Sequence, residues 1–315
     1  MSARPALRAR GIALAELMIA MALGLLVLLG AVSALLASSR SAAAQAQAAN
    51  MDDAARFALA AIDRAARQSG YVDWDRADAA NDPDPAGPPA VHGLDAASLA
   101  PAAHALNDPR PAAINGSDIL ALRFGGGGAG AGDGSVTTCA GWSVGAGQEG
   151  WSIFYVALSA DGRPELRCKY RGANNWSADA VISGVDSFQV LYGVDTSAPA
   201  DGVADSFFSA SVINDMDGAL VGAGATEAAQ ARDVRRRSWW HRVTSIKVAL
   251  ILRAEGAAVQ DQGPRLLHAF GAAYSQARGD ADTGTRLDRG AMDPAEQRRA
   301  HRVFSATIVL RNRAR

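Results

Sequence analysis

The sequence is poor in lysine, since only Lys169 and Lys247 occur among its 31 basic residues. Alanine is abundant, so a helix prediction that rests on alanine alone carries little weight. The formal net charge of the 315-residue chain is −1, which gives no reason to expect a polyanion as the main partner. A charged content of 20% argues against a wholly disordered chain, and the length allows a sizeable buried core.

Cysteine is nearly absent as well, with Cys139 and Cys168 as the two in the chain. Because there is no CxxC pair and no third cysteine, the sequence excludes a cysteine-based zinc site and a thioredoxin-like motif. Residues 125–135 are rich in glycine but contain no GK[ST] sequence, which excludes a P-loop. They are interpreted as a flexible loop between strands.

Proline is absent between Pro5 and Pro83, and charge is absent from residues 12–36 except at Glu16. A run this long and apolar is typical of a transmembrane helix, which crosses about 30 Å of hydrocarbon. The basic residues ahead of it are Arg4, Arg8 and Arg10. The positive-inside rule therefore predicts a cytoplasmic N-terminus, with the rest of the chain on the other side of the membrane.

The helical pattern continues beyond the apolar run, over residues 37–69. Apolar side chains recur at three- and four-residue steps in this half, at Ala54, Phe57, Ala58, Ala61, Ile62 and Ala65. Gly70 then supplies a stop signal. We therefore expect a single helix from about Ile12 to Ser69, roughly 85 Å long at about 1.5 Å per residue. Its second half would pack a narrow apolar stripe against another part of the protein.

After the helix, residues 70–115 are rich in proline, alanine and aspartate, which predicts an extended, loop-dominated connection. Six strand-like runs follow, at 118–124, 150–159, 164–171, 184–194, 244–253 and 302–311. Several strands after one long helix favour an α+β fold. In this fold the long N-terminal helix packs on an antiparallel, β-rich globular domain, here residues 116–315.

A helix-capping motif precedes the last strand-like run. Asp293 is placed as N-cap, Pro294 occupies the first helical position and Glu296 the third. This capping-box arrangement predicts a short helix.

Three further patterns suggest chemistry but fit it poorly. Gly141 to Gly145 reads GWSVG, the sequence of a nucleophile elbow, yet Ser143 lacks the preceding strand and following helix that this motif requires. The acidic residues Asp195, Asp201 and Asp205 break the EF-hand register and leave only a weak calcium candidate beside a solvated turn. No other metal site and no cofactor is expected, because the five histidines lack paired ligand spacing.

Residues 232–243 interleave arginines with Trp239 and Trp240, a pattern that can bind nucleic acid. Because a strand-like run follows directly, the favoured interpretation is a basic loop whose tryptophans pack at a sheet edge. Nucleic acid is therefore an unlikely partner.

The two cysteines lie in the part predicted to be extracytoplasmic, where oxidising conditions allow a disulfide. A Cys139–Cys168 bond would stabilise the fold by on the order of 3 to 4 kcal/mol in the chain-entropy model. The alternative is a pair of free thiols.

An acid inside a membrane costs several kcal/mol unless it is paired, so Glu16 is a functional candidate. The apolar run itself contains no cation that could pair with it. The stretch RARGIALAELMIAMALGLLVLLG resembles the class III leader and hydrophobic helix of type IV prepilins. The downstream blocks GVDSFQVLYGVD, WWHRVTSIKVALILR and RRAHRVFSATIVLRNR are similar to minor pilins of the PilW family.

This resemblance implies that residues 1–11 are a leader and that prepilin peptidase cuts between Gly11 and Ile12. Ile12 would become the N-methylated terminus, and Glu16 would be fifth in the mature chain. In this family the glutamate is thought to face the terminal amine of a neighbouring subunit, which would supply the missing cation. Ile12 is a departure, because the family most often has phenylalanine there.

The resemblance also implies a structural, non-enzymatic role. The protein would be a minor pilin that primes type IV pilus assembly and is incorporated near the fibre tip, in twitching motility and adhesion. Its partners would be other minor pilins, the major pilin, prepilin peptidase and the inner-membrane assembly machinery. It would span the inner membrane once, with a periplasmic domain, before entering the extracellular pilus. The alternatives are a type II secretion pseudopilin and a membrane-anchored periplasmic hydrolase that uses Ser143.

Overall fold

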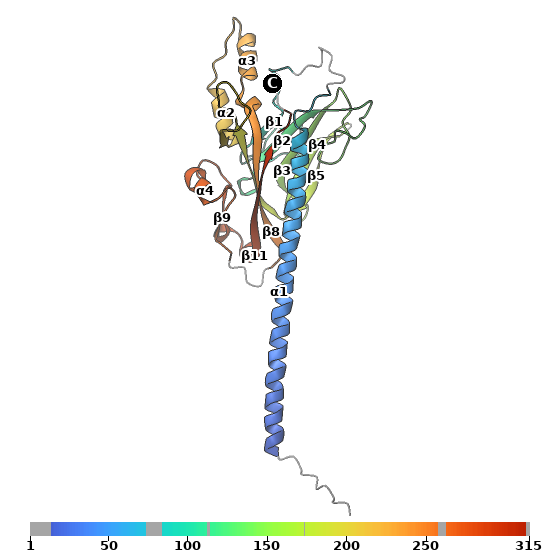
Figure 1. Ribbon diagram of the computed structural model, residues 1–315, viewed down its shortest axis with the longest axis vertical. Coiled ribbons are helices and arrows are strands. Elements are labelled where there is room, and N and C mark those ends of the chain that lie inside the picture. Colours follow the sequence, from blue (N-terminus) through green and yellow to red (C-terminus); the bar gives the residue numbers. More distant parts are fainter. Residues whose placement is uncertain (1–13, 74–83, 112–113, 173, 258–262, 313–315) are drawn as a thin grey trace, which may run out of the picture. The chain divides into compact units, whose positions relative to one another are not determined.

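The computed structural model describes residues 14–73, 84–111, 114–172, 174–257 and 263–312. The chain forms two compact units, Met1–Ala49 and Asn50–Arg315. A single long helix, α1 (Leu14–Gln68), contributes its first part to one unit and its second part to the other (Figure 1). The predicted helix from about Ile12 to Ser69 is thus observed over its described length.

The first part of α1 is apolar, and its side chains are exposed. By length and composition, this helix is suited to crossing a membrane. Exposing so many Leu, Val and Met side chains to water is energetically unfavourable, whereas placing them in the hydrocarbon of a membrane is favourable. The exposed apolar surface suggests that this helix anchors the protein in a membrane.

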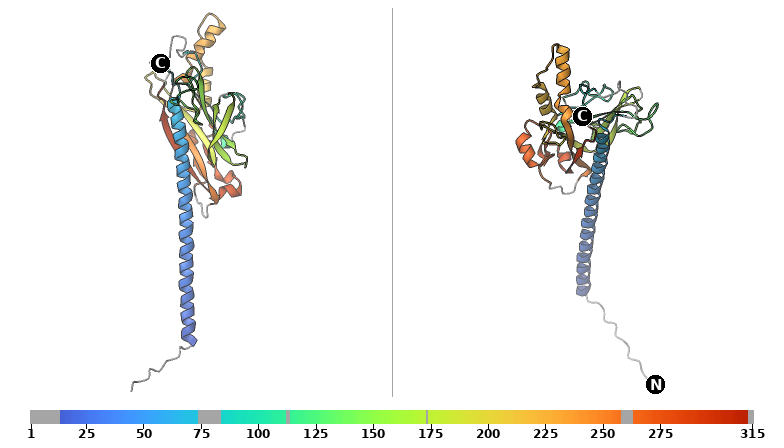
Figure 2. Two further views of the ribbon diagram at one scale, coloured as in Figure 1. Left: turned by 90° about the vertical axis from the view of Figure 1, so that its right-hand side faces the viewer. Right: turned by 45° about the horizontal axis from the view of Figure 1, so that its top comes forward.

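The second unit contains two antiparallel sheets (Figure 2). The first sheet has the order β1-β2-β3-β4-β5 and the second has the order β11-β8-β6-β7. The strands β9 and β10 form a separate, small two-stranded sheet. The strands are β1 (Val91–Leu94), β2 (Ile119–Gly125), β3 (Glu149–Leu158), β4 (Pro164–Arg171), β5 (Trp176–Ser183), β6 (Val185–Val194), β7 (Ser206–Phe208), β8 (Val243–Ala257), β9 (Leu266–His268), β10 (Arg286–Asp288) and β11 (Arg299–Val309). The α+β fold predicted from the sequence is confirmed.

Short helices join the strands. The α-helices are α2 (Ala210–Gly218), α3 (Glu227–Arg236), α4 (Ala272–Arg278) and α5 (Pro294–Gln297). The 3₁₀-helices are η2 (Ile114–Gly116), η3 (Trp239–Arg242) and η4 (Arg289–Ala291). The predicted helix at the capping motif is present as α5, directly before β11.

All six predicted strand-like runs form strands, namely β2, β3, β4, β6, β8 and β11. The sequence did not reveal β1, β5, β7, β9 and β10. Four of these have three or four residues, and the eight residues of β5 are mostly exposed or half-buried. The four short segments have too few residues to show an alternation of period two, whereas the alternation in β5 rests mainly on two alanines between Trp176 and Ile182.

The second half of α1 packs its alanine-rich face against the core. The buried side chains of the helix are Met51, Ala55, Ala58, Ile62, Ala65 and Ala66. Phe57, which we expected on this face, is 61% exposed. Alanine occurs on every side of this helix, so the spacing alone did not identify the correct face.

The main core lies between this helix half and both sheets. All ten residues of β6 are buried, which makes β6 the central strand of the domain. Gly184 connects β5 to β6 with φ at +75°, a conformation that side chains other than glycine rarely adopt. The tight turn lets the chain pass from one sheet to the other.

The segment after β1 covers the other face of the first sheet. Ala97 and Leu99 pack there against Ile153 and Tyr155. The fully buried Lys169 of β4 donates from Nζ to the carbonyl oxygens of Ala100 and Ala105, at 3.1 and 2.8 Å. Burial lowers the pKa of Lys169 to about 8. The expected loop-dominated connection therefore contains the edge strand β1 and a tightly packed covering segment.

Candidate functional site

Glu16 lies in the first turn of α1, within the exposed apolar part of the helix. The next charged residue along the chain is Arg40. In the described part of the chain, no hydrogen bond or ion pair is formed by the Glu16 carboxylate. Gly11 and Ile12, the predicted cleavage site, lie outside the described residues.

Cys139 and Cys168 are joined in a disulfide, with their Cα atoms 6.1 Å apart. Cys168 lies in β4, and Cys139 lies in a tight turn in which Thr138 N donates to Trp142 O at 2.8 Å. Trp142 is 61% exposed at this turn. A bond across this separation in the sequence stabilises the domain by about 3 kcal/mol in the chain-entropy model.

The basic segment 232–243 is helical, so the predicted basic loop is wrong. It forms the end of α3 and the 3₁₀-helix η3, which a composition of arginine, aspartate and valine permits. Asp233 accepts from the side chains of Arg236 and Arg237, at 2.9 and 2.5 Å. Trp240 is buried and donates from its indole to Asn214 Oδ1 at 2.9 Å. The segment thus uses four of its five arginines and a tryptophan in contacts within the protein, since Arg232 also pairs with Asp84 and Arg242 with Asp195.

The acidic loop directs its carboxylates to its own backbone. Asp195 accepts from Gly202 N at 2.6 Å, Asp201 from Val203 N at 2.8 Å, and Asp205 from Thr196 N at 2.7 Å. The hydrogen bond from Gly202 lowers the pKa of Asp195. In the residues that the structure describes, no group of three or more His, Cys, Asp and Glu side chains is arranged to hold a metal ion.

Ser143 is exposed and pairs through an isolated β-bridge with Thr137. The segment that follows it is a loop and then β3, so the strand and helix of a nucleophile elbow are both missing. Over the described ranges, no hydrogen bond joins Ser143 to a histidine. This geometry offers no general base for a nucleophilic serine.

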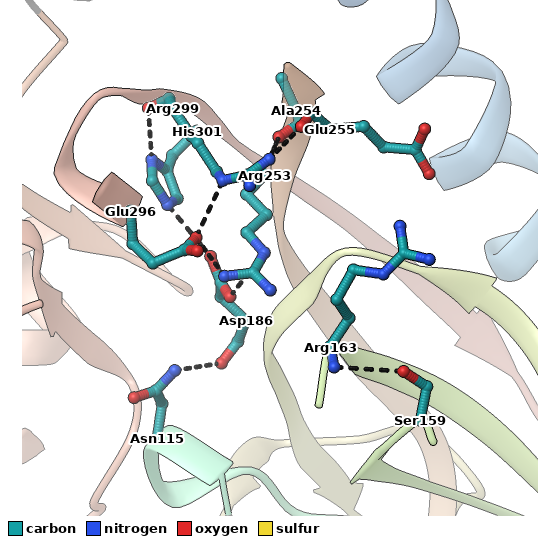
Figure 3. A network of polar contacts seen from close by, with 10 residues as sticks. All are labelled: Asn115, Ser159, Arg163, Asp186, Arg253, Ala254, Glu255, Glu296, Arg299 and His301. Atoms are coloured by element: carbon teal, nitrogen blue, oxygen red, sulfur yellow. Dashed lines mark hydrogen bonds and ion pairs between the residues drawn. The ribbon is translucent and has the colours of Figure 1, made fainter. Parts of the chain in front are cut away.

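A network of charged side chains ties β6, β8, α5 and β11 together (Figure 3). Asp186 lies 3.0 Å from Nε2 of His301 and 3.6 Å from Nε of Arg253. Glu296 contacts Arg253 and lies 3.2 Å from Nε of Arg299. The predicted capping box is therefore only half right, because α5 forms but has no side-chain cap. The Glu296 carboxylate instead pairs with Arg299, three residues later in the sequence, and with Arg253 of β8.

Three aspartates that sequence reasoning missed form a second polar group in the interior. Asp118 accepts from Ala96 N at 3.1 Å and from Val190 N at 2.9 Å. Asp95 accepts from the first two backbone N–H groups of α2 and so caps a helix whose own N-cap side chain makes no such bond. Burial raises the pKa of Asp118 well above its usual range, and the charge of Asp95 adds to this effect.

Asp282 is the third aspartate, and it gives the domain a pH-dependent stability. Burial raises its pKa to about 6, although it accepts from the Tyr274 hydroxyl at 2.8 Å. Between about pH 4 and 6 the unfolded chain has lost this proton while the folded chain keeps it, so stability falls as pH rises. We expect a loss of about 1 to 2 kcal/mol between about pH 4 and pH 7, after discounting for solvent screening.

Urea unfolding of the full chain in detergent at these two pH values measures the effect. Asp282→Asn keeps an oxygen for Tyr274 but cannot ionise, so its stability should vary less with pH. Asp280→Asn is the matched control, because the Asp280 side chain is fully exposed. An unchanged pH slope in Asp282→Asn would contradict the assignment.

A cavity of about 610 Å³ lies beside α3 and η3. Its walls include Pro88, His92, Arg235, Trp240 and His241. Burial lowers the pKa of both histidines, which leaves them neutral near pH 7. The His92 ring packs on Trp240 with centroids 4.4 Å apart, so it acts as part of the cavity wall.

Comparison with known proteins gives one match. A family model described as type IV pilus-assembly protein W matches residues 153–312, which is half of the chain. No curated protein and no solved structure matches. The matched region runs from β3 to just beyond β11 and includes the whole second sheet.

Proposed function

Because this chain belongs to the PilW family of type IV pilus-assembly proteins, we propose that it is a minor pilin. It is a structural subunit that primes pilus assembly and enters the fibre near its tip, where it serves twitching motility and adhesion. The family is one of assembly and not of catalysis, which agrees with the poor geometry around Ser143.

The observation that carries this proposal is the position of Glu16 in the exposed apolar part of α1. Residues 14–36 of this helix contain no cation. An unpaired carboxylate in hydrocarbon is costly, so it needs a partner from outside its own helix. Cleavage between Gly11 and Ile12 creates a terminal amine on every mature subunit. The amine of one subunit then pairs with Glu16 of the next as subunits leave the membrane.

The β-rich domain supports a place outside the cytoplasm and at the end of the fibre. Its disulfide agrees with an oxidising compartment. Before assembly the protein spans the inner membrane with this domain in the periplasm. In the inner membrane it meets prepilin peptidase, the assembly machinery, other minor pilins and the major pilin. A bulky domain is accommodated more easily at a tip than within a repeating shaft.

Sequencing the N-terminus of the mature protein tests this proposal. We expect the chain purified from cells with active prepilin peptidase to begin at N-methylated Ile12, and the chain from cells without that peptidase to retain residues 1–11. A chain that still carries its leader in the presence of the peptidase would refute the minor-pilin role. Deletion of the gene should abolish twitching motility. Loss of secreted enzymes instead would identify a type II secretion pseudopilin.

A further inference from the structure

The two sheets have four edge strands, and these differ in how they are protected. β1 has four residues and β7 has three, and strands this short offer too few backbone groups to pair with another strand. β5 has eight residues but carries Asp179 near its middle and pairs irregularly with β4. A charged side chain and a β-bulge are two common features that prevent an edge strand from pairing with another chain. The remaining edge is β11, the longest of the four with 11 residues.

On the side away from β8, the backbone of β11 carries a regular set of N–H and C=O groups. No described strand pairs with these groups. Leu310 N donates to Thr244 O at 2.9 Å, and the pairing with β8 is regular from His301 to Val309. In an antiparallel pair, alternate residues direct their N–H and C=O groups toward the partner strand. The even-numbered residues therefore face β8. The residues that direct these groups to the open side are Val303, Ser305, Thr307 and Val309.

This edge lacks the usual protection over most of its length. From Val303 to Val309 the sequence is VFSATIV, with no charge and no proline. The irregular pairing of β11 lies earlier, between Arg299 and His301. Val303 and Val309 are 36% and 60% exposed. A long, uncharged and regular edge of this kind is a template for another strand.

The charges that flank this edge indicate what kind of strand it accepts. Residues 297–312 contain four arginines and no acidic residue. Arg298 and Arg311, at the two ends of the edge, are exposed. A second copy of this chain would bring its own basic ends against these arginines, which is unfavourable. A strand with carboxylates at its ends would complement them.

We propose that the open edge of β11, residues 303–309, is a docking site for an extended strand of another pilus subunit. The strand it accepts is uncharged in its centre and has aspartate or glutamate at its ends. Only the identity of the partner as a pilus subunit rests on the proposed function. The partner would extend the second sheet from four strands to five, and backbone hydrogen bonds would provide most of the affinity.

Two synthetic peptides test the edge. One is Asp-Asp-Val-Thr-Val-Thr-Val-Thr-Val-Asp-Asp, and the other has lysine in place of each aspartate. Binding of each labelled peptide to the full chain in detergent micelles is measured by fluorescence anisotropy. We expect the aspartate peptide to bind at least about ten-fold more tightly than the lysine peptide at low salt. Replacing both Arg298 and Arg311 by glutamate should reverse this preference.

Thr307→Pro tests whether the backbone edge is used. The N–H of Thr307 faces away from β8, so proline removes no hydrogen bond of the ladder, and edge positions tolerate it. The variant should bind the aspartate peptide at least about ten-fold more weakly. Thr307→Val keeps the N–H and should bind like the unchanged chain. Circular dichroism checks that each variant is folded. If Thr307→Pro does not fold, the variant with glutamate at positions 298 and 311 still tests the edge.

Equal binding of both peptides, or a charge preference that does not reverse in the double variant, would overturn the proposal. A folded Thr307→Pro variant that binds as before would also overturn it. A dimer of the chain, seen by light scattering and lost in Thr307→Pro, would mean that a second copy occupies the edge and would refute the acidic partner. None of these measurements depends on leader cleavage, so they fail or succeed independently of the minor-pilin proposal.

Discussion

Replacing Glu16 with alanine is expected to remove the protein from pili while leaving it in the membrane. The carboxylate makes insertion less favourable by about 3 kcal/mol when it is unpaired, so its loss should not reduce the amount in the membrane. Assembly is different, because there the carboxylate pairs with the amine of a neighbouring subunit in a medium of low dielectric constant. We expect at least about a ten-fold decrease in the amount of this subunit in sheared pili.

Immunoblots of sheared pili and of membranes from the same cells measure both quantities. Leu17→Ala is the matched control, because it alters the adjacent position of the same exposed apolar segment and keeps the acid. Glu16→Gln keeps the shape of the side chain without its charge and should behave like Glu16→Ala. Normal amounts of either Glu16 variant in pili would show that the acid has another purpose.

Replacing Asp118 with alanine is expected to destabilise the domain by about 2 to 4 kcal/mol. Asp118 is 2% exposed and accepts from two backbone N–H groups, one before β2 and one in the middle of β6. Alanine would leave both N–H groups without this acceptor, at a cost of about 1 to 3 kcal/mol for the buried N–H of Val190 and less for the part-buried N–H of Ala96.

Urea unfolding of the full chain in detergent tests this expectation. Asp118→Asn retains one acceptor oxygen and should lose less stability than Asp118→Ala. Asp161→Ala is the matched control, because the Asp161 side chain is 76% exposed and its loss should change stability by less than about 0.5 kcal/mol. If Asp118→Ala unfolded at the same urea concentration as the unchanged chain, the two hydrogen bonds would not be important for stability.

The strands were predictable where their residues are buried on one or both faces. β6 and β8 read directly from the sequence as apolar runs, because both lie in the interior of the second sheet. The edge strand β5 was missed, because its eight side chains are exposed or half-buried and its alternation relies on alanines, which are abundant throughout this chain. Burial, and not strand formation itself, leaves the recognisable pattern.

The polar interior was not predictable at all. Asp95, Asp118 and Asp282 are far apart along the chain, and aspartates are most often surface residues. Glu296 illustrates the same limit, because its local sequence predicted a capping box. In the folded domain Arg253 and Arg299 are close enough to pair with it, and charged hydrogen bonds to arginine outweigh the local cap.

The amino-acid sequence by itself determined the long helix, the single acid of its apolar part, the positions of the main strands and the PilW family. These features depend on residues that are neighbours along the chain. The tertiary structure decided which face of α1 is buried, why Phe57 is exposed, where the interior carboxylates find their donors and which strand edge stays open. Each of these depends on segments that meet only after folding, because burial and hydrogen bonding are properties of the packed arrangement and not of the local sequence.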